Sequence, residues 1–250
     1  MNVLEVCCGS LNSVLAAVEG GAERIELCSA LSLDGLTPSI GLIQEVRRLF
    51  PTLKIHVLIR PREGGFVYSE AEVRVMEQDI HEAVAAGASA IVGGALTSAN
   101  KLDVKATHRL VVASEGLPFT FHRAFDLIED KAAALEALRV LGVRRILTSG
   151  GAQTAEAGIP VLRQLVQQAS SRTSTLSILP GGGVNSANAH RILSETGATE
   201  IHGSCSALLP NGQRQTSPDE VRAVLQAINS FPFPLHDRET TSARDVAQLP

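Results

Sequence analysis

Short apolar segments of strand length alternate with longer segments of helical periodicity along almost the whole chain. The expected strands cover residues 4–8, 24–29, 54–60, 90–95, 118–123, 145–149, 177–180 and 200–204. The expected helices cover residues 10–19, 39–50, 69–86, 104–113, 131–141, 158–169, 186–196 and 218–229. Strict alternation of eight strands and eight helices within 250 residues predicts an α/β fold, a single-domain (β/α)8 TIM barrel.

The domain organisation follows from composition along the chain. Residues 1–230 are expected to form the barrel, and residues 231–250, which begin Phe-Pro-Phe-Pro, a C-terminal tail. A net charge of −4 with interspersed signs argues against nucleic-acid binding, and no apolar run reaches the roughly 18 residues of a membrane span. Because the expected first strand begins at once, no signal peptide is predicted, and we expect a cytoplasmic protein with reduced cysteines.

Three glycine-bearing turns follow the last three expected strands. Glycine lets backbone N–H groups approach a ligand closely, and the ends of these strands form the usual phosphate corner of a TIM barrel. Each turn alone is better explained as a tight connection between strand and helix. Together they predict an oxyanion site made by Gly150, Gly151, Gly181, Gly182, Gly183, Gly203 and Ser204.

Side-chain alternation predicts which residues enter the barrel. The apolar set of each strand should face the helices, which sends the other set inward. The polar residues expected inside are Glu5, Cys7, Glu26, Cys28, His56, Arg60, Thr120, His122, Glu200, His202 and Ser204. Barrel interiors are normally aliphatic, and buried ionisable groups are costly unless paired. The set is therefore either a self-satisfied network or a functional site.

As a functional site, the interior suggests an isomerase or lyase acting on a small phosphorylated or carboxylated compound. The candidate catalytic residues are Glu26, His56, Arg60 and His122. Glu26 or His122 would be the base, and Arg60 would either bind the anionic group or pair with Glu26. Arg123 and Asp126 are candidates for orienting the substrate. A hydrolytic metal centre through Glu5, Glu26, His56 and His202 is an alternative, and a pure scaffold is a third class.

Several strand-end segments resemble the CutC family of copper homeostasis proteins. They are residues 24–31, 35–39, 56–62, 66–69, 120–126, 146–151 and 180–184. The resemblance runs from about Leu4 to Ser204. It implies a cytoplasmic TIM-barrel protein, often oligomeric, with a historical link to copper tolerance.

The residues themselves indicate how well the chain could bind copper. Cu(I) prefers thiolate and thioether ligands, yet the chain has no Cys-x-x-Cys motif and its methionines are Met1 and Met76. The local candidates for a Cu(I) site are Cys7 and Cys28, which are expected inside on adjacent strands, with His56 nearby. The expected partners are therefore a small anionic molecule or a copper ion, together with further copies of the chain in a homo-oligomer.

Overall fold

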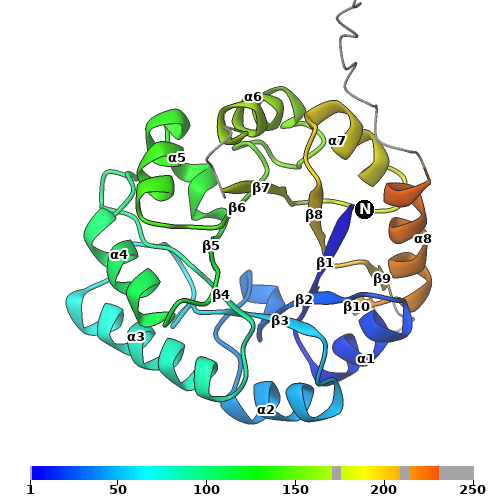
Figure 1. Cartoon of the computed structure of the whole chain (residues 1–250), viewed down its shortest axis with the longest axis horizontal. Helices are drawn as coiled ribbons and strands as arrows, with labels where there is room; N and C mark the ends of the chain where they lie inside the picture. The colour runs from blue at the N-terminus through cyan, green and yellow to red at the C-terminus, as the bar shows by residue number, and fades with distance from the viewer. Residues whose placement is uncertain (1, 171–175, 209–213, 231–250) are drawn as a thin grey trace, which may run out of the picture.

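The computed structural model describes residues 2–170, 176–208 and 214–230, which form the predicted barrel. Figure 1 looks into a ring of strands surrounded by a ring of helices. The barrel strands are β1 (Val3–Cys8), β2 (Arg24–Leu27), β3 (Lys54–Leu58), β4 (Ala90–Gly93), β5 (Phe119–Phe121), β6 (Arg145–Thr148), β7 (Ser177–Pro180) and β8 (Glu200–Gly203). Each lies within one residue of, or inside, its expected segment, so the fold prediction is confirmed.

The helices between the strands also match the expected segments. They are α1 (Leu11–Glu19), α2 (Ile40–Leu49), α3 (Glu70–Ala85), α4 (Val104–Ala113), α5 (Lys131–Val140), α6 (Ile159–Ala169), α7 (Ala189–Thr196) and α8 (Pro218–Asn229). Capping side chains explain many of the starts, because an oxygen at the N-cap accepts an otherwise unpaired helix N–H. The caps that do so are Ser10, Ser39, Ser69, Asp103, Asp130 and Ser217.

All neighbouring barrel strands are parallel, in the order β7-β6-β5-β4-β3-β2-β1-β8. A parallel bridge between Gly181 and His202 joins β7 to β8 and closes the ring. The carboxyl ends of all eight strands therefore meet at one mouth, where a TIM barrel holds its functional loops.

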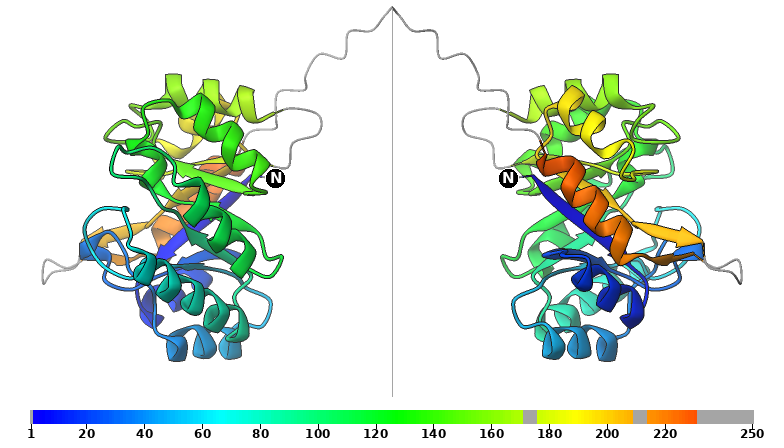
Figure 2. Two further views of the ribbon diagram at one scale, coloured as in Figure 1. Left: turned by 90° about the vertical axis from the view of Figure 1, so that its left-hand side faces the viewer. Right: turned by 90° about the vertical axis from the view of Figure 1, so that its right-hand side faces the viewer.

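Four short elements were not expected from the sequence. Two are 3-10 turns at the mouth, η1 (Leu31–Leu33) and η2 (Arg123–Leu127). The others are β9 (Ser206–Leu208) and β10 (Arg214–Thr216), an antiparallel pair that projects beyond the barrel, as Figure 2 shows. The predicted tail, residues 231–250, lies outside the described residues. Among the described residues, no helix combines the length and apolar character needed to cross a bilayer.

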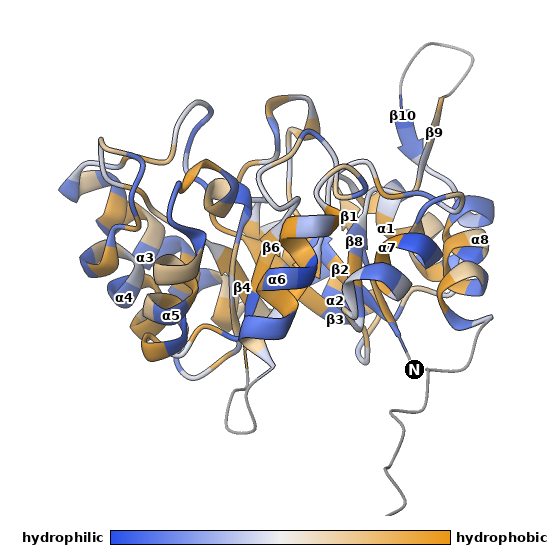
Figure 3. Cartoon of the chain, turned by 90° about the horizontal axis from the view of Figure 1, so that it is seen from above, coloured by the Kyte–Doolittle hydropathy of each residue, from blue (hydrophilic) through white to orange (hydrophobic). Residues whose placement is uncertain are grey.

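The predicted alternation of side chains is also confirmed. The main apolar core, which includes Leu4, Val6, Ile25 and Ile55, lies between the strands and the helices. A separate small cluster of Cys7, Cys28, Leu58 and Val92 comes from the other face of the strands. Figure 3 shows the apolar strands enclosed by helices whose outer faces are hydrophilic, with β9 and β10 at the opposite end from the N-terminus.

The ring of helices closes where α1 packs against α8, and this packing can be tested by mutation. A methyl group on Gly20 would lie 2.5 Å from the Cβ of Val221 and 2.8 Å from the carbonyl oxygen of Pro218. We predict that Gly20→Ala lowers the free energy of unfolding by about 1–3 kcal/mol, because the added methyl overpacks this contact. Denaturant unfolding of the purified variant measures it.

Gly41→Ala is the matched control, since Gly41 lies in α2 with nothing within 4 Å of an added Cβ. Alanine in a helix is favoured over glycine by roughly 0.5–1 kcal/mol, so this variant should be more stable than the wild type. Equal effects of the two substitutions would contradict the packing described for α1 and α8.

Candidate active site at the mouth of the barrel

The buried carboxylate of Glu5 organises the middle of the barrel. Its side chain is 0 % exposed, and β1 places it opposite Arg24 on β2 and His202 on β8. Its oxygens lie 2.6 Å from Nδ1 of His56, 3.0 Å from Nδ1 of His202 and 3.0 Å from Nε of Arg24. Burial alone would raise the pKa of Glu5, but these three partners hold it well below its ordinary value. Glu5 is therefore ionised in the folded protein.

An ion-pair network closes the barrel on the side of Glu5 away from the mouth. Glu200 accepts from Arg24 at 2.5 Å, from Arg145 at 2.9 Å and from Ser177 at 2.6 Å. Burial opposes ionisation of Glu200, but the two arginines lower its pKa. Because these oxygens are fully engaged, we assign this network to stability and not to chemistry.

On the mouth side of Glu5, three potential ligand or acid–base groups converge. A ligand atom from each of Cys7, Glu26 and His202 lies within 4.8 Å of the others, and all three side chains are buried. The thiol of Cys7 donates to Oε1 of Glu26 over 3.7 Å, while Oε2 of Glu26 has no hydrogen-bond partner among the described residues. The free oxygen is a polar group that a bound molecule could satisfy.

Glu26 and His202 both have raised pKa values, for different reasons. Burial raises the pKa of Glu26, and the charge of Glu5 adds to this against the opposing effect of His202. Burial would lower the pKa of His202, but Glu26, Cys7 and Glu5 together hold it well above its ordinary value. The pKa of Glu26 is thus raised while that of Glu5 is lowered in the same lumen. Two carboxyl groups with pKa values moved in opposite directions are typical of acid–base sites.

His122 lies across the mouth as a buried neutral imidazole. Its Nδ1 accepts from the backbone N–H of Ala124 at 3.4 Å, which leaves the proton on Nε2, and Nε2 has no partner among the described residues. The ring lies 4.7 Å from the ring of Phe66. Burial and the nearby charge of Arg60 lower the pKa of His122 to about 3. His122 is thus suited to donate a hydrogen bond and poorly suited to act as a base.

Cys7 and Cys28 lie side by side, as their expected positions on adjacent strands require. Their sulfurs are 3.8 Å apart, and the thiol of Cys28 also donates to the carbonyl of Cys8. The contact with the Cys28 thiol, burial and the charge of Glu26 raise the pKa of Cys7 well above its ordinary value. Without a bound cation, Cys7 is therefore a thiol. A soft metal would have to displace its proton.

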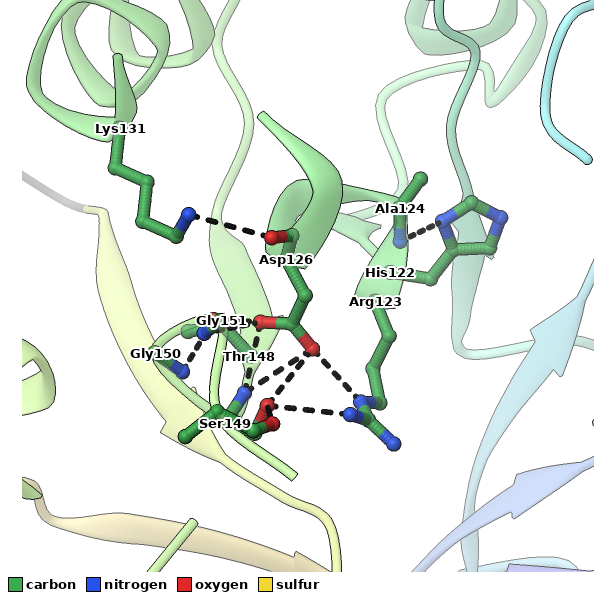
Figure 4. Close-up of polar contacts among 10 residues, drawn as sticks. His122, Arg123, Ala124, Asp126, Lys131, Thr148, Ser149, Gly150 and Gly151 are labelled. Carbon is green, nitrogen blue, oxygen red and sulfur yellow. Dashed lines mark hydrogen bonds and ion pairs between the residues drawn. The ribbon is translucent and has the colours of Figure 1, made fainter. Parts of the chain in front are cut away.

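The first of the three glycine turns is occupied by a carboxylate of the chain itself. Asp126, from η2, accepts the backbone N–H groups of Ser149 and Gly151 and the hydroxyls of Thr148 and Ser149 (Figure 4). The N–H of Gly150 bonds to Oγ1 of Thr148. Of the three turns predicted to bind an anion, the first is thus filled by Asp126. Anion binding at the second turn (Gly181–Gly183) and the third (Gly203 and Ser204) stays a prediction.

The second and third turns lie together at the mouth. Gly182 and Gly183 have φ values of +110° and +71°, which residues other than glycine rarely adopt. A Cβ on Gly203 would lie 3.4 Å from the carbonyl oxygen of Val184, so the two turns are in contact. Gly181 donates to the carbonyl of Thr148 and belongs to the sheet.

Arg60 contacts the backbone of two loops at the mouth of the barrel. Its guanidinium donates to the carbonyls of Leu33, Gly35 and Gly64, and its Cζ lies 5.2 Å from the ring centroid of Phe66. No ion pair joins it to Glu26 within the part of the chain that the structure describes. Arg60 holds the β2–α2 and β3–α3 loops together, and its role as an anion anchor remains a prediction.

A cavity of about 750 Å³ opens at this mouth, lined by Cys7, Glu26, His122, Arg123, Gly182 and His202 among others. It brings together the candidate residues Glu26 and His122 with the glycines of the second turn. His56 lies deeper, on Glu5. The alternation of side chains predicted His202 inside the barrel, but His202 was not among the predicted catalytic residues, because its pairing with Glu5 connects the first and last strands and has no local motif.

These observations define a (β/α)8 barrel protein whose lumen carries ion pairs and titratable groups beside a small apolar cluster. The model of the CutC family matches residues 2–207. A CutC-family protein of Glaesserella parasuis serovar 5 is 44% identical over 91% of this chain and 90% of its own length. The human copper homeostasis protein cutC homolog is 43% identical over 85% of this chain and 76% of its own. The chain belongs to the CutC family.

Solved structures agree with this family and with the fold. A CutC protein from Streptococcus agalactiae, 37% identical, superposes with a TM-score of 0.77 over 82% of this chain and 99% of that one. Phosphoribosyl anthranilate isomerase from Thermotoga maritima has a TM-score of 0.60 over 92% of this chain and all of that one. At 12% identity, the second likeness concerns the fold alone.

The lowered pKa of His122 predicts an acid-sensitive stability. Between pH 6.5 and about 3 the unfolded chain binds a proton on His122 that the folded protein does not bind, so the free energy of unfolding falls as pH falls. This residue alone should remove about 1.5 kcal/mol between pH 6.5 and pH 5. In His122→Asn, an amide oxygen can still accept the N–H of Ala124 but the group does not titrate.

Denaturant unfolding at the two pH values, for wild type and His122→Asn, measures the difference. We expect the wild type to lose more stability on acidification than the variant does. Parallel losses in the two proteins would show that His122 takes up a proton equally in both states.

Proposed function

We propose that this protein is an enzyme that transfers a proton on a small anionic metabolite, as an isomerase or lyase does, in the cavity at the barrel mouth. One observation carries the proposal: Glu26 lines this cavity, is 5 % exposed, and has a free carboxyl oxygen. Its raised pKa favours a general base, which works best when its pKa is close to the operating pH.

His202 is proposed as the group that returns the proton. Its raised pKa keeps the imidazole protonated beside Glu26, and the contact of Nδ1 with Glu5 fixes the ring. A buried carboxylate that holds an imidazole and stabilises its charged form is the arrangement used in catalytic triads. Glu5 and, through it, His56 would act as positioning residues, since neither lines the cavity.

His122 is proposed as a neutral hydrogen-bond donor to the substrate. Its Nε2 proton is free, and a donor fixed in a buried site stabilises the oxygen charge that develops when a carbon next to a carbonyl loses its proton. The sequence left either Glu26 or His122 as the base, and the pKa values distinguish between them. Glu26 would take the proton, because His122 with a pKa of about 3 binds protons too weakly.

Hydrogen exchange tests the proton transfer without knowledge of the product. A panel of phosphorylated sugars and 2-oxo acids is incubated with the protein in D2O, and loss of C–H signals is followed by proton NMR. We expect exchange of at least one compound, reduced at least 100-fold by Glu26→Gln. The control is Glu136→Gln, on the exposed face of α5, which should exchange at the wild-type rate. An inactive panel, or an unaffected Glu26→Gln variant, contradicts the proposal.

A Cu(I) site is a second candidate function, supported by the 3.8 Å contact between the sulfurs of Cys7 and Cys28. Cu(I) prefers thiolates, and His202 adds an imidazole near Cys7. The names of the relatives point the same way, since the human protein is called a copper homeostasis protein cutC homolog. The free cysteines suit the reducing cytoplasm proposed for this protein. The homo-oligomer stays a prediction of the sequence.

Anaerobic Cu(I) titration against a competing chelator tests this candidate. We expect the affinity to rise with pH, because the proton of Cys7 must leave, and to be lost in the Cys7→Ser, Cys28→Ser double variant. Cys8→Ala is the control, since the Cys8 side chain belongs to the core between strands and helices. Undiminished binding in the double variant would exclude the site.

A further inference from the structure

Asp126 occupies a place where an external anion would be expected. Its side chain is 11% exposed and accepts backbone N–H groups of the turn after β6, as a bound phosphate does in many barrels (Figure 4). The lysine that begins α5, Lys131, donates to the backbone carbonyls of Asp126 and Ile128. Both the carboxylate and the segment that carries it are therefore fixed.

The fixed carboxylate in turn holds Arg123. Nε of Arg123 donates to Oδ2 of Asp126 at 2.9 Å, and Nη2 donates to Oγ of Ser149 at 3.1 Å. Nη1 has no partner among the described residues. Arg123 is 45% exposed, lines the cavity, and lies over Gly182, whose Cβ, if present, would be 3.4 Å from Cζ and Nη1. One edge of the guanidinium is thus anchored, and the other is available at the mouth.

The turn beneath this free edge offers further donors. Within the described part of the chain, the backbone N–H groups of Gly182, Gly183 and Val184 have no hydrogen-bond acceptor. Gly182 and Gly183 line the same cavity as Glu26. Donors of a guanidinium and of a backbone turn therefore line the same cavity, and donors from two such directions suit a tetrahedral group with several terminal oxygens.

We propose that Arg123, together with the backbone amides of Gly182–Val184, binds the phosphoryl group of the substrate, and that Asp126 positions Arg123 for it. The inference rests on the proposed function for the identity of the ligand as a substrate. It assigns the anion to Arg123 in place of Arg60, whose Nη1 and Nη2 donate to loop carbonyls and which is not among the residues that line the cavity. It also explains why the turn after β6 carries its own carboxylate.

Binding of inorganic phosphate to the full-length protein tests the subsite directly. Isothermal titration calorimetry at constant ionic strength measures the dissociation constant for phosphate. We expect Arg123→Gln to raise this constant at least tenfold. Arg222→Gln is the matched control, because Arg222 is 46% exposed and forms the same i,i+3 ion pair, with Asp219, on the outer helix α8. Its phosphate affinity should equal that of the wild type. Equal affinity in Arg123→Gln would overturn the assignment.

A double-mutant cycle separates positioning from a general structural effect. If Asp126 acts through Arg123, Asp126→Asn should weaken phosphate binding in the wild type and change it no further in Arg123→Gln. Additive losses would overturn the positioning role. Phosphate binding that fails while D2O exchange persists would refute this subsite alone. Phosphate binding at Arg123 without any exchange would refute the proposed enzyme and leave the subsite standing.

Discussion

The structure depends on one buried carboxylate, Glu5, and the three cationic or imidazole groups around it. An ionised carboxyl group at 0 % exposure is tolerated only when its charge is balanced at close range. Arg24, His56 and His202 come from β2, β3 and β8, so satisfying Glu5 connects strands from both ends of the chain. Barrels of this kind are usually filled with aliphatic side chains, whereas this lumen holds a charged centre beside the apolar cluster that includes Leu58 and Val92.

The charge of Glu5 also sets the chemistry of the groups nearer the mouth. It favours protonation of His202 and opposes ionisation of Glu26, so a carboxyl with a raised pKa lies beside an imidazole with a raised pKa. In the network below Glu5, both carboxylate oxygens of Glu200 are engaged by Arg24, Arg145 and Ser177. The polar residues of the barrel thus divide into a structural half and a half that opens to the cavity.

Much of the fold was predictable because local patterns and global architecture agree. Alternating apolar residues placed Glu26 and His202 inside the barrel, and glycine turns marked the strand ends. What could not be predicted depends on contacts between distant segments. Asp126 fills a turn 22 to 25 residues further along the chain, and Arg60 meets carbonyls of two other loops. Period and spacing carry no record of such partners, so these contacts were not predicted.

The strands β9 and β10 illustrate the same limit. Each is three residues long, too short for alternation to distinguish it from a loop, and their pairing depends on register. Cys7 and Cys28 are the opposite case, since two inward positions on adjacent strands were enough to place their sulfurs together.

The central claim is that one lumen moves the pKa values of two carboxyl groups in opposite directions. Carbon-13 NMR of protein labelled at the glutamate side-chain carboxyl measures this directly, with Glu5→Gln and Glu26→Gln identifying the two signals. We predict that Glu26 titrates above the ordinary glutamate range while Glu5 stays ionised well below it. A Glu26 signal that titrates at or below the ordinary value would contradict the account.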